Sequence, residues 1–106
     1  MESKLQEMLI KAVEYEEVLT YGYIGEQLGI HPRIVEKLFS EVDEVFKENG
    51  LPPISTIVVN GTDMICGEGY FKEHYPKIKD RLKIWVDNLN TIFSNKSKVI
   101  DLIATK

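Results

Sequence analysis

Apolar residues recur every three or four positions along three stretches of the chain, and this period predicts a mainly helical protein. The first stretch covers residues 3–18 and the second covers residues 32–48, where an i, i+3, i+4 stripe continues for several turns. The third covers residues 75–93 and predicts a long C-terminal helix. The apolar segment 99–103 is expected to dock as a short tail. The stripes consist of Leu5, Met8, Leu9, Ala12 and Val13, then Ile34, Val35, Leu38, Phe39, Val42, Val45 and Phe46, then Ile78, Leu82, Trp85, Val86, Leu89, Ile92 and Phe93.

Residues 20–48 have the pattern of a helix-turn-helix. Thr20 can cap a short helix over residues 21–28, and Gly29 can adopt the positive φ that ends it. Gly25 stands where the two helices would cross and leaves room for close approach. Pro32 then suits the first turn of the second helix, because its missing N–H needs no partner there. The residues expected to turn inward are Ile24, Leu28, Ile30, Val35 and Leu38.

The segment after the second helix predicts a β-hairpin. Asn49-Gly50 is a stop signal for a helix, and the β-branched run 54–59 is typical of a strand. Asn60-Gly61 is the preferred pair for a tight hairpin turn, although Thr62-Asp63 could lengthen the loop, and residues 64–66 would form the return strand. Residues 67–71 contain two glycines and are expected to be flexible. A helix-turn-helix followed by a hairpin is the winged-helix plan, so we expect a mainly α fold with a small β-hairpin and a long C-terminal helix.

Length and composition indicate one domain over residues 1–106, with the helix-turn-helix at 20–48, the wing at 54–66 and the last helix at 75–93. No apolar run is long enough to span a bilayer, and the acidic amino terminus lacks the plan of a signal peptide, so a cytoplasmic protein is expected. Cys66 is the only cysteine, which excludes an internal disulfide. His31 and His74 have no companion ligands at metal spacing, so neither a metal nor another cofactor is expected. We also expect no catalytic residue.

Charge is distributed unevenly along the chain. The net charge is −4, whereas a nucleic-acid-binding module is usually basic. Residues 1–50 carry 11 acidic and 5 basic side chains, whereas residues 72–106 carry 4 acidic and 8 basic ones. Such asymmetry can orient a protein on a polyanion, or drive head-to-tail contact between proteins, including two copies in a homodimer. A solvated surface whose charge is merely uneven explains this distribution at least as well.

Five short segments, in the same order, resemble the C-terminal domain of O6-alkylguanine-DNA alkyltransferases and their non-catalytic alkyltransferase-like relatives. That family has a Thr-Tyr-Gly-like helix start, Arg-Ala-Val at the recognition helix, an Asn-Pro linker, a Pro-Cys-His-Arg-Val-Val active-site strand and a glycine-aromatic loop. The resemblance covers about 50 of the 106 residues. The matching segments are Thr20-Tyr21-Gly22, Arg33-Ile34-Val35, Asn49-Gly50-Leu51-Pro52-Pro53, Ser55-Thr56-Ile57-Val58-Val59 and Gly67-Glu68-Gly69-Tyr70-Phe71.

This resemblance implies a phosphate contact for Tyr21, and for Arg33 the role of entering the base stack in place of a flipped base. It departs from the family where the chemistry would occur. Ser55-Thr56 replaces the Cys-His pair, and neither residue supplies a thiolate or an imidazole base. Cys66 is expected on the far side of the hairpin from this pair, so alkyl transfer is not expected.

The stretch 50–71 also resembles a pattern in small uncharacterised proteins of phages and mobile elements, which carries no assigned activity. Two functions therefore stay open. The first is a non-catalytic module that binds duplex DNA through its helix-turn-helix. The second is a protein-interaction module, such as a phage-borne inhibitor or adaptor of a host defence or regulatory protein. Glu36 and Glu41 favour this second function, because on a DNA-binding surface each carboxylate would face phosphates at a cost in binding free energy. The residues expected on the binding surface are Tyr21, His31, Arg33, Lys37, Ser40, Gly67, Gly69 and Tyr70.

Overall fold

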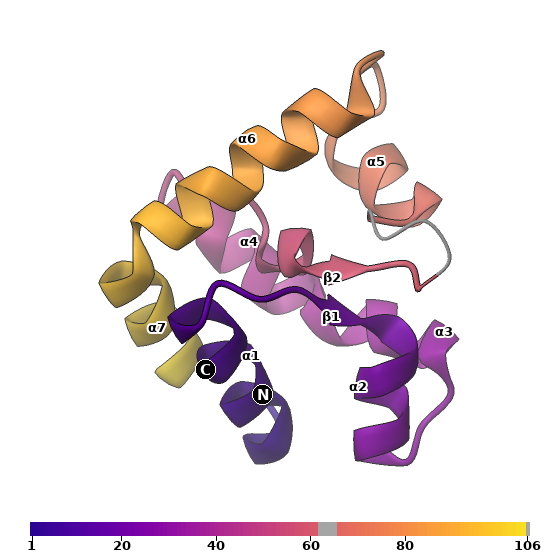
Figure 1. Ribbon diagram of the computed structural model, residues 1–106, viewed down its shortest axis with the longest axis vertical. Coiled ribbons are helices and arrows are strands. Elements are labelled where there is room, and N and C mark those ends of the chain that lie inside the picture. The colour runs from indigo at the N-terminus through magenta and orange to yellow at the C-terminus, as the bar shows by residue number, and fades with distance from the viewer. Residues whose placement is uncertain (62–65, 106) are drawn as a thin grey trace.

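A computed structural model describes residues 1–61 and 66–105 and shows helices arranged around a small parallel sheet (Figure 1). It confirms the mainly α expectation. The molecule measures 35 × 29 × 23 Å along its principal axes. The elements, in chain order, are α1 (Ser3–Glu14), β1 (Leu19–Thr20), α2 (Tyr21–Leu28), α3 (Pro32–Val35), the 3₁₀ turn η1 (Glu36–Phe39), α4 (Ser40–Glu48), the 3₁₀ turn η2 (Ile54–Ile57), β2 (Val58–Val59), α5 (Glu68–His74), α6 (Arg81–Ser94) and α7 (Lys96–Ala104).

The first half of the helix-turn-helix forms as the sequence predicts. The Thr20 side chain accepts a hydrogen bond from the backbone N–H of Tyr23 at 3.0 Å, and Gly29 ends α2 with φ +69°. A Cβ atom at Gly25 would lie 2.7 Å from the carbonyl oxygen of Ile30, so only glycine fits where α2 meets the following turn. His31 caps α3, because its Nδ1 accepts from the backbone N–H of Arg33 at 3.1 Å.

The second arm is helical over 32–48, but it is not one α-helix. The 3₁₀ turn η1 separates α3 from α4, and the buried stripe is narrower than predicted. Because a 3₁₀ turn has about three residues per turn, it changes which side chains point inward. Ile34 and Leu38, expected in the core, are 47% and 36% exposed. The buried residues of this arm are Val35, Phe39, Val42, Asp43 and Phe46.

The predicted strand 54–59 is wrong over most of its length. Ile54–Ile57 is a 3₁₀ turn, and only Val58–Val59 is extended; it pairs in parallel with β1, Leu19 opposite Val58. Residues 53–59 are all buried, so the segment has no solvent face of the kind a wing strand presents. Asn60 and Gly61 are not among the residues with positive φ, so the expected tight turn is also wrong. Most of the return strand 64–66 and the loop before it lie outside the described residues, whereas Cys66 belongs to no strand.

The C-terminal part also departs from prediction. Residues 67–71, for which no helix is predicted, include the start of α5. The long helix begins at Arg81 rather than at residue 75, because Asp80 caps it by accepting the backbone N–H of Lys83 at 3.0 Å. Its face toward the core is formed by Trp85, Asn88 and Ile92. Leu82 and Val86 of this helix and Ile78 of the preceding connection, all predicted inside, are 58%, 41% and 39% exposed. The apolar tail does dock, as helix α7.

The main core lies between α1, α2, α4, η2, α6 and α7. Helices α1 and α7 pack side by side and bring the two ends of the chain together (Figure 1). Helix α1 ends at Glu14, earlier than predicted, and Glu16 with φ +53° turns the chain toward β1. A second, smaller cluster consists of Cys66, Tyr70 and Phe71, with Tyr75, Ile84 and Trp85 packed around it. This second cluster supports the face on which the helix-turn-helix begins.

Candidate nucleic-acid interface

A surface groove of about 270 Å³ lies where α2 and α3 begin. It brings Tyr21 and Arg33, separated by a whole helix in sequence, to one site together with the residues that follow β2. The parallel pairing of β1 and β2 brings the residues that follow the two strands together, because Thr20 and Val59 are paired and the next residues of each segment enter the groove. Arg33 reaches the same groove because α3 packs against α2. The groove is lined by Tyr21, Gly22, Pro32, Arg33, Glu36, Asn60 and Gly61.

The Tyr21 side chain remains neutral over the physiological pH range. Burial raises the pKa of its phenol well above the ordinary value, and the neighbouring Cys66, Glu36 and Asp43 raise it further. A neutral phenol can donate a hydrogen bond to an anionic oxygen. The side chain also borders a smaller cavity of about 70 Å³ beneath the groove, which Glu36 shares.

The other predicted residues of the helix-turn-helix are all exposed. Arg33 lies in the groove, while His31, Lys37 and Ser40 lie on the surface of the same arm. One ring nitrogen of His31 is engaged in capping α3, so only its Nε2 is available to a ligand. The structure therefore brings Tyr21 and Arg33 into one groove and leaves the remaining three outside it.

The glycine-aromatic segment lies beside this face, as predicted, but Tyr70 does not belong to the surface. A Cβ atom at Gly69 would lie 3.5 Å from a carboxylate oxygen of Glu36, and one at Gly67 would lie 4.0 Å away. Tyr70 is only 4% exposed. Because α5 is amphipathic and packs on η2, its aromatic residue points into the second cluster rather than to solvent. The prediction that Tyr70 contacts a partner is therefore wrong.

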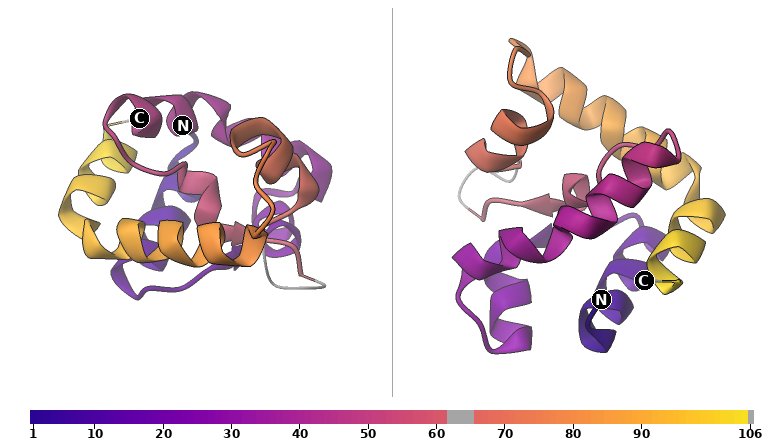
Figure 2. Two further views of the ribbon diagram at one scale, coloured as in Figure 1. Left: turned by 90° about the horizontal axis from the view of Figure 1, so that it is seen from above. Right: turned by 180° about the vertical axis from the view of Figure 1, so that it is seen from behind.

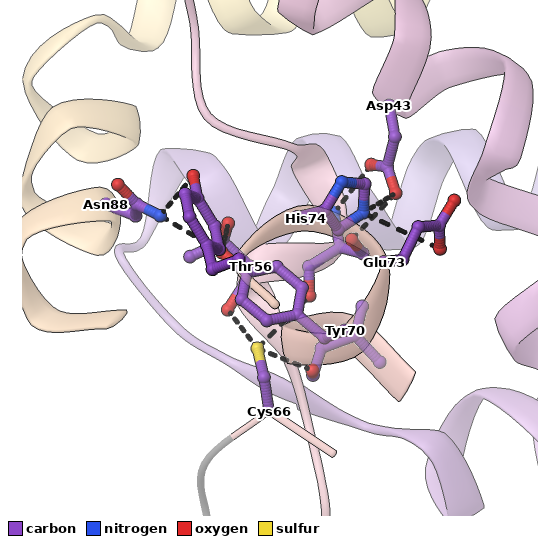
Figure 3. A network of polar contacts seen from close by, with 10 residues as sticks. Asp43, Thr56, Cys66, Tyr70, Glu73, His74 and Asn88 are labelled. Atoms are coloured by element: carbon purple, nitrogen blue, oxygen red, sulfur yellow. Dashed lines mark hydrogen bonds and ion pairs between the residues drawn. The ribbon is translucent and has the colours of Figure 1, made fainter. Parts of the chain in front are cut away.

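Tyr70 instead belongs to a buried hydrogen-bond network (Figure 3). Its hydroxyl lies 2.8 Å from Thr56 Oγ1 and accepts from Asn88 Nδ2 at 3.1 Å. Asn88 also donates to the hydroxyl of Tyr75 at 2.8 Å, and Trp85 Nε1 donates to the carbonyl of Thr56 at 3.0 Å. Burial raises the pKa of the Tyr70 phenol, so its proton stays in the network. These bonds join α5 and α6 to the turn η2.

A second polar cluster holds the position at which the alkyltransferase family has its cysteine. The buried carboxylate of Asp43 accepts from the backbone N–H of Ser55 at 3.0 Å and from its hydroxyl at 2.7 Å. His74 Nε2 lies 3.5 Å from the same carboxylate (Figure 3). The carboxylate therefore stands between serine and histidine, whereas a nucleophilic serine needs the histidine next to its own hydroxyl. The arrangement anchors η2 and α5 to α4.

Cys66 lies against this turn and not on its far side. Its sulfur is 3.4 Å from the carbonyl oxygens of Thr56 and Val58, and 3.6 Å from that of Ser55. The predicted separation from the Ser55-Thr56 pair is wrong, because the Cys66 sulfur packs directly against the backbone of both residues. Burial is the main cause that raises the pKa of the Cys66 thiol, so it stays protonated and a poor nucleophile.

Sequence reasoning missed Asn60 as a residue of the groove, and Asp43, His74 and Asn88 as members of the buried clusters. Asp43 could have been found, because it lies four residues after Phe39 and three before Phe46, on the buried stripe of its helix. His74 and Asn88 meet their partners only through the tertiary fold, so no local pattern identifies them.

Two basic side chains of α7 have partners of their own. Lys96 forms an ion pair with Glu16 at 3.0 Å, and Lys98 donates to the backbone carbonyl of Asn49 at 3.1 Å, both in the region of α7. Among the described residues, no three His, Cys, Asp or Glu side chains are placed to hold a metal ion. Within residues 1–61 and 66–105, no helix combines the length and the apolar character needed to cross a membrane.

Comparison with models of protein families gives no match for this chain, and no significant match is found among the curated proteins or the solved structures. The features that bear on function are therefore the geometry of the groove, the charges around it and the resemblance of the five sequence segments.

Proposed function

We propose that this protein is a non-catalytic, alkyltransferase-like module of winged-helix type that binds duplex DNA through the groove at the start of α2 and α3. The observation that carries the proposal is the meeting of Tyr21 and Arg33 in one exposed groove. These are the two residues to which the sequence resemblance assigns DNA contacts. The packing of α3 against α2, across the turn that follows Gly29, brings them together.

The chemistry of the groove suits a phosphate backbone. Tyr21 and Gly22 are the first two residues of α2, and the start of a helix carries a partial positive charge that favours anions. Arg33 supplies a guanidinium, which binds phosphate or the edge of a guanine through two parallel hydrogen bonds. The proposal assigns Tyr21 to a phosphate and Arg33 to the bases. It assigns no reaction, because Ser55 is held by Asp43 and Cys66 is buried as a thiol.

A duplex-binding titration of wild type and Arg33→Ala tests the proposal. Fluorescence anisotropy with a labelled duplex at about 50 mM salt should show wild-type binding that weakens as salt rises. Arg33→Ala should lose about 1–3 kcal/mol of binding free energy. Lys47→Ala, a change of the same charge at an exposed position near the end of α4, is the matched control and should bind like wild type. Absence of wild-type binding at this salt concentration would refute the proposal.

A second function, a protein-interaction module, is favoured by one specific observation. Ile34 and Leu38 are exposed one helical turn apart on the recognition arm, and Leu38 borders an apolar depression of about 300 Å³ together with Leu28 and Ile30. Exposed apolar pairs on a helix are typical of sites that bind another protein. Ile34→Ser/Leu38→Ser separates the two functions, because it should abolish capture of a host protein while leaving duplex affinity within about twofold, a change below the usual effect of losing one contact.

A further inference from the structure

The helix-turn-helix alone carries too little positive charge to hold a duplex. Residues 20–48 contain three basic and six acidic side chains, and Glu36 lies inside the groove itself. Phosphate contacts supply most of the affinity of DNA-binding proteins, and each needs a cation. If the groove binds DNA, another part of the molecule has to supply basic side chains.

The basic residues are concentrated around the connection between α5 and α6, from the last turn of α5 to the first turn of α6. Residues 72–83 contain five basic and two acidic side chains, the highest density of positive charge in the chain. Lys72, Lys77 and Lys79 are exposed, and they form no ion pair with any side chain that the structure describes. They differ in this from Lys83, which is paired with Asp87 at 3.1 Å.

This basic connection and the groove lie along the same edge of the molecule. Figure 1 shows α3, α5 and the turn that leads into α6 along the right-hand edge, with α1 and α7 at the opposite side. The view from behind shows the same order along one edge (Figure 2). Gly69 of α5 beside Glu36, and His74 beside Asp43, fix α5 against the helix-turn-helix arm. The edge is therefore a packed unit.

We propose that Lys72, Lys77 and Lys79 form a second contact surface for the phosphate backbone of the duplex that the groove binds. The connection between α5 and α6 thus performs the task that a basic wing performs in other winged-helix proteins, since the described residues after β2 contain no lysine or arginine before Lys72. This inference rests on the proposed function and names the phosphate-binding part of the same interface. The connection is held by Asp80 at the start of α6 and by Arg81, whose guanidinium lies 5.0 Å from the ring centre of Phe71.

The salt dependence of duplex binding tests this inference. Each phosphate contact contributes about 0.9 to the slope of log affinity against log salt concentration. Lys77→Gln/Lys79→Gln should therefore reduce the magnitude of the slope by about 1.8, and should weaken binding about 100-fold at about 50 mM salt. Lys11→Gln/Lys98→Gln removes the same charge from two exposed lysines of α1 and α7, and it should leave the slope unchanged.

The possible results separate this inference from the function on which it rests. A reduced slope in the first variant and an unchanged slope in the control support the second contact surface. If wild type binds duplex and Arg33→Ala weakens it while the Lys77/Lys79 variant binds like wild type, the groove stands and the second surface is refuted. Equal losses in both lysine pairs would show non-specific attraction and would also refute it. If wild type does not bind duplex, both proposals fall together, and the lysines with the exposed Ile78 and Leu82 belong to another kind of partner.

Discussion

Gly25 is the position at which the geometry of the helix-turn-helix can be tested most directly. A Cβ atom there would lie 2.7 Å from the carbonyl oxygen of Ile30 and 3.3 Å from the backbone nitrogen of Pro32. Both are backbone atoms, so no side chain can rotate away. To reach an ordinary contact of about 3.4 Å, the turn between the two helices would have to move away from α2. That turn is held by the hydrogen bond from the Ile30 N–H to the Gly25 carbonyl at 2.9 Å.

The expected magnitude follows from three contributions. Alanine is better than glycine inside a helix by about 1 kcal/mol, which favours the variant. The steric overlap costs about 1–3 kcal/mol, and a weakened hydrogen bond at the end of α2 costs about 1 kcal/mol more. Gly25→Ala should therefore lower the free energy of unfolding by about 1–3 kcal/mol. Gly22 lies in the same helix with no atom within 4 Å of its Cβ position, so Gly22→Ala should raise this free energy by about 0.5–1 kcal/mol.

Urea unfolding followed by the fluorescence of Trp85, the single tryptophan, gives both free energies under identical conditions. The two variants should differ by about 2–4 kcal/mol, because propensity acts equally on both and the overlap acts only on Gly25. Gly25→Ala should also weaken duplex binding, since the displaced turn carries Arg33 away from Tyr21. Equal stability of the two alanine variants would refute the close approach of α2 and the turn.

Three other substitutions test the clusters and turns. Asp43→Ala should lower the free energy of unfolding by about 3 kcal/mol, because it leaves both donors of Ser55 buried without an acceptor. Ser55→Ala should cost about half as much, and chemical unfolding of both variants measures the difference. Gly50→Ala should lower the free energy of unfolding by about 1 kcal/mol, because φ is +71° there. Gly61→Val should change this free energy by less than about 0.5 kcal/mol, and a large loss of stability would instead support a tight turn at Asn60-Gly61. Burial raises the pKa of both Cys66 and Tyr70, so the folded protein keeps their protons at a pH at which the unfolded chain releases them. The free energy of unfolding should therefore fall as pH rises above about 9, the ordinary pKa of a thiol. Cys66→Ala should make this fall shallower in unfolding curves measured at several pH values, and an identical pH dependence would contradict the buried thiol.

The parts of the fold that were predictable are those governed by neighbouring residues. Thr20, Gly29 and Gly50 act through a cap or through their own φ, and each does in the structure what its type predicts. Helix α2 consequently begins and ends where it was expected. The meeting of Tyr21 and Arg33 was suggested only by resemblance, and it depends on a turn of a few residues whose geometry Gly25 determines.

The failures occur where a segment is buried on all sides. The β-branched residues of the run 54–59 predict a wing strand, yet Ile54–Ile57 is a 3₁₀ turn. A hydrogen bond to Asp43 and burial in the core hold this turn in place. Intrinsic β preference mainly reflects fit to a half-exposed pleated surface, and this segment has no exposed side. Tyr70 and the exposed face of α6 were misplaced for a related reason: periodicity identifies an apolar side of a helix but not the element that will cover it.

The surroundings of Ser55 differ from those that a reactive side chain at this position would need. In the family that the sequence resembles, this position carries the nucleophile, and its surroundings have to leave one side chain exposed and reactive. Here the hydroxyl and the backbone N–H of the same residue both donate to a buried carboxylate, which ties η2 to α4. Under the proposed function, the groove would recognise a duplex by contacts to its backbone and bases. The lysines around the connection between α5 and α6 would then supply the positive charge that residues 20–48 lack. Replacing Ser55 by cysteine would therefore not create a reactive site, because the new thiol would be buried beside the Asp43 carboxylate, and both burial and that negative charge raise a thiol pKa. Intact-mass analysis of Ser55→Cys after incubation with alkylated-guanine duplex should show an unmodified protein, and stoichiometric alkylation at residue 55 would show that only the missing sulfur separates this site from catalysis.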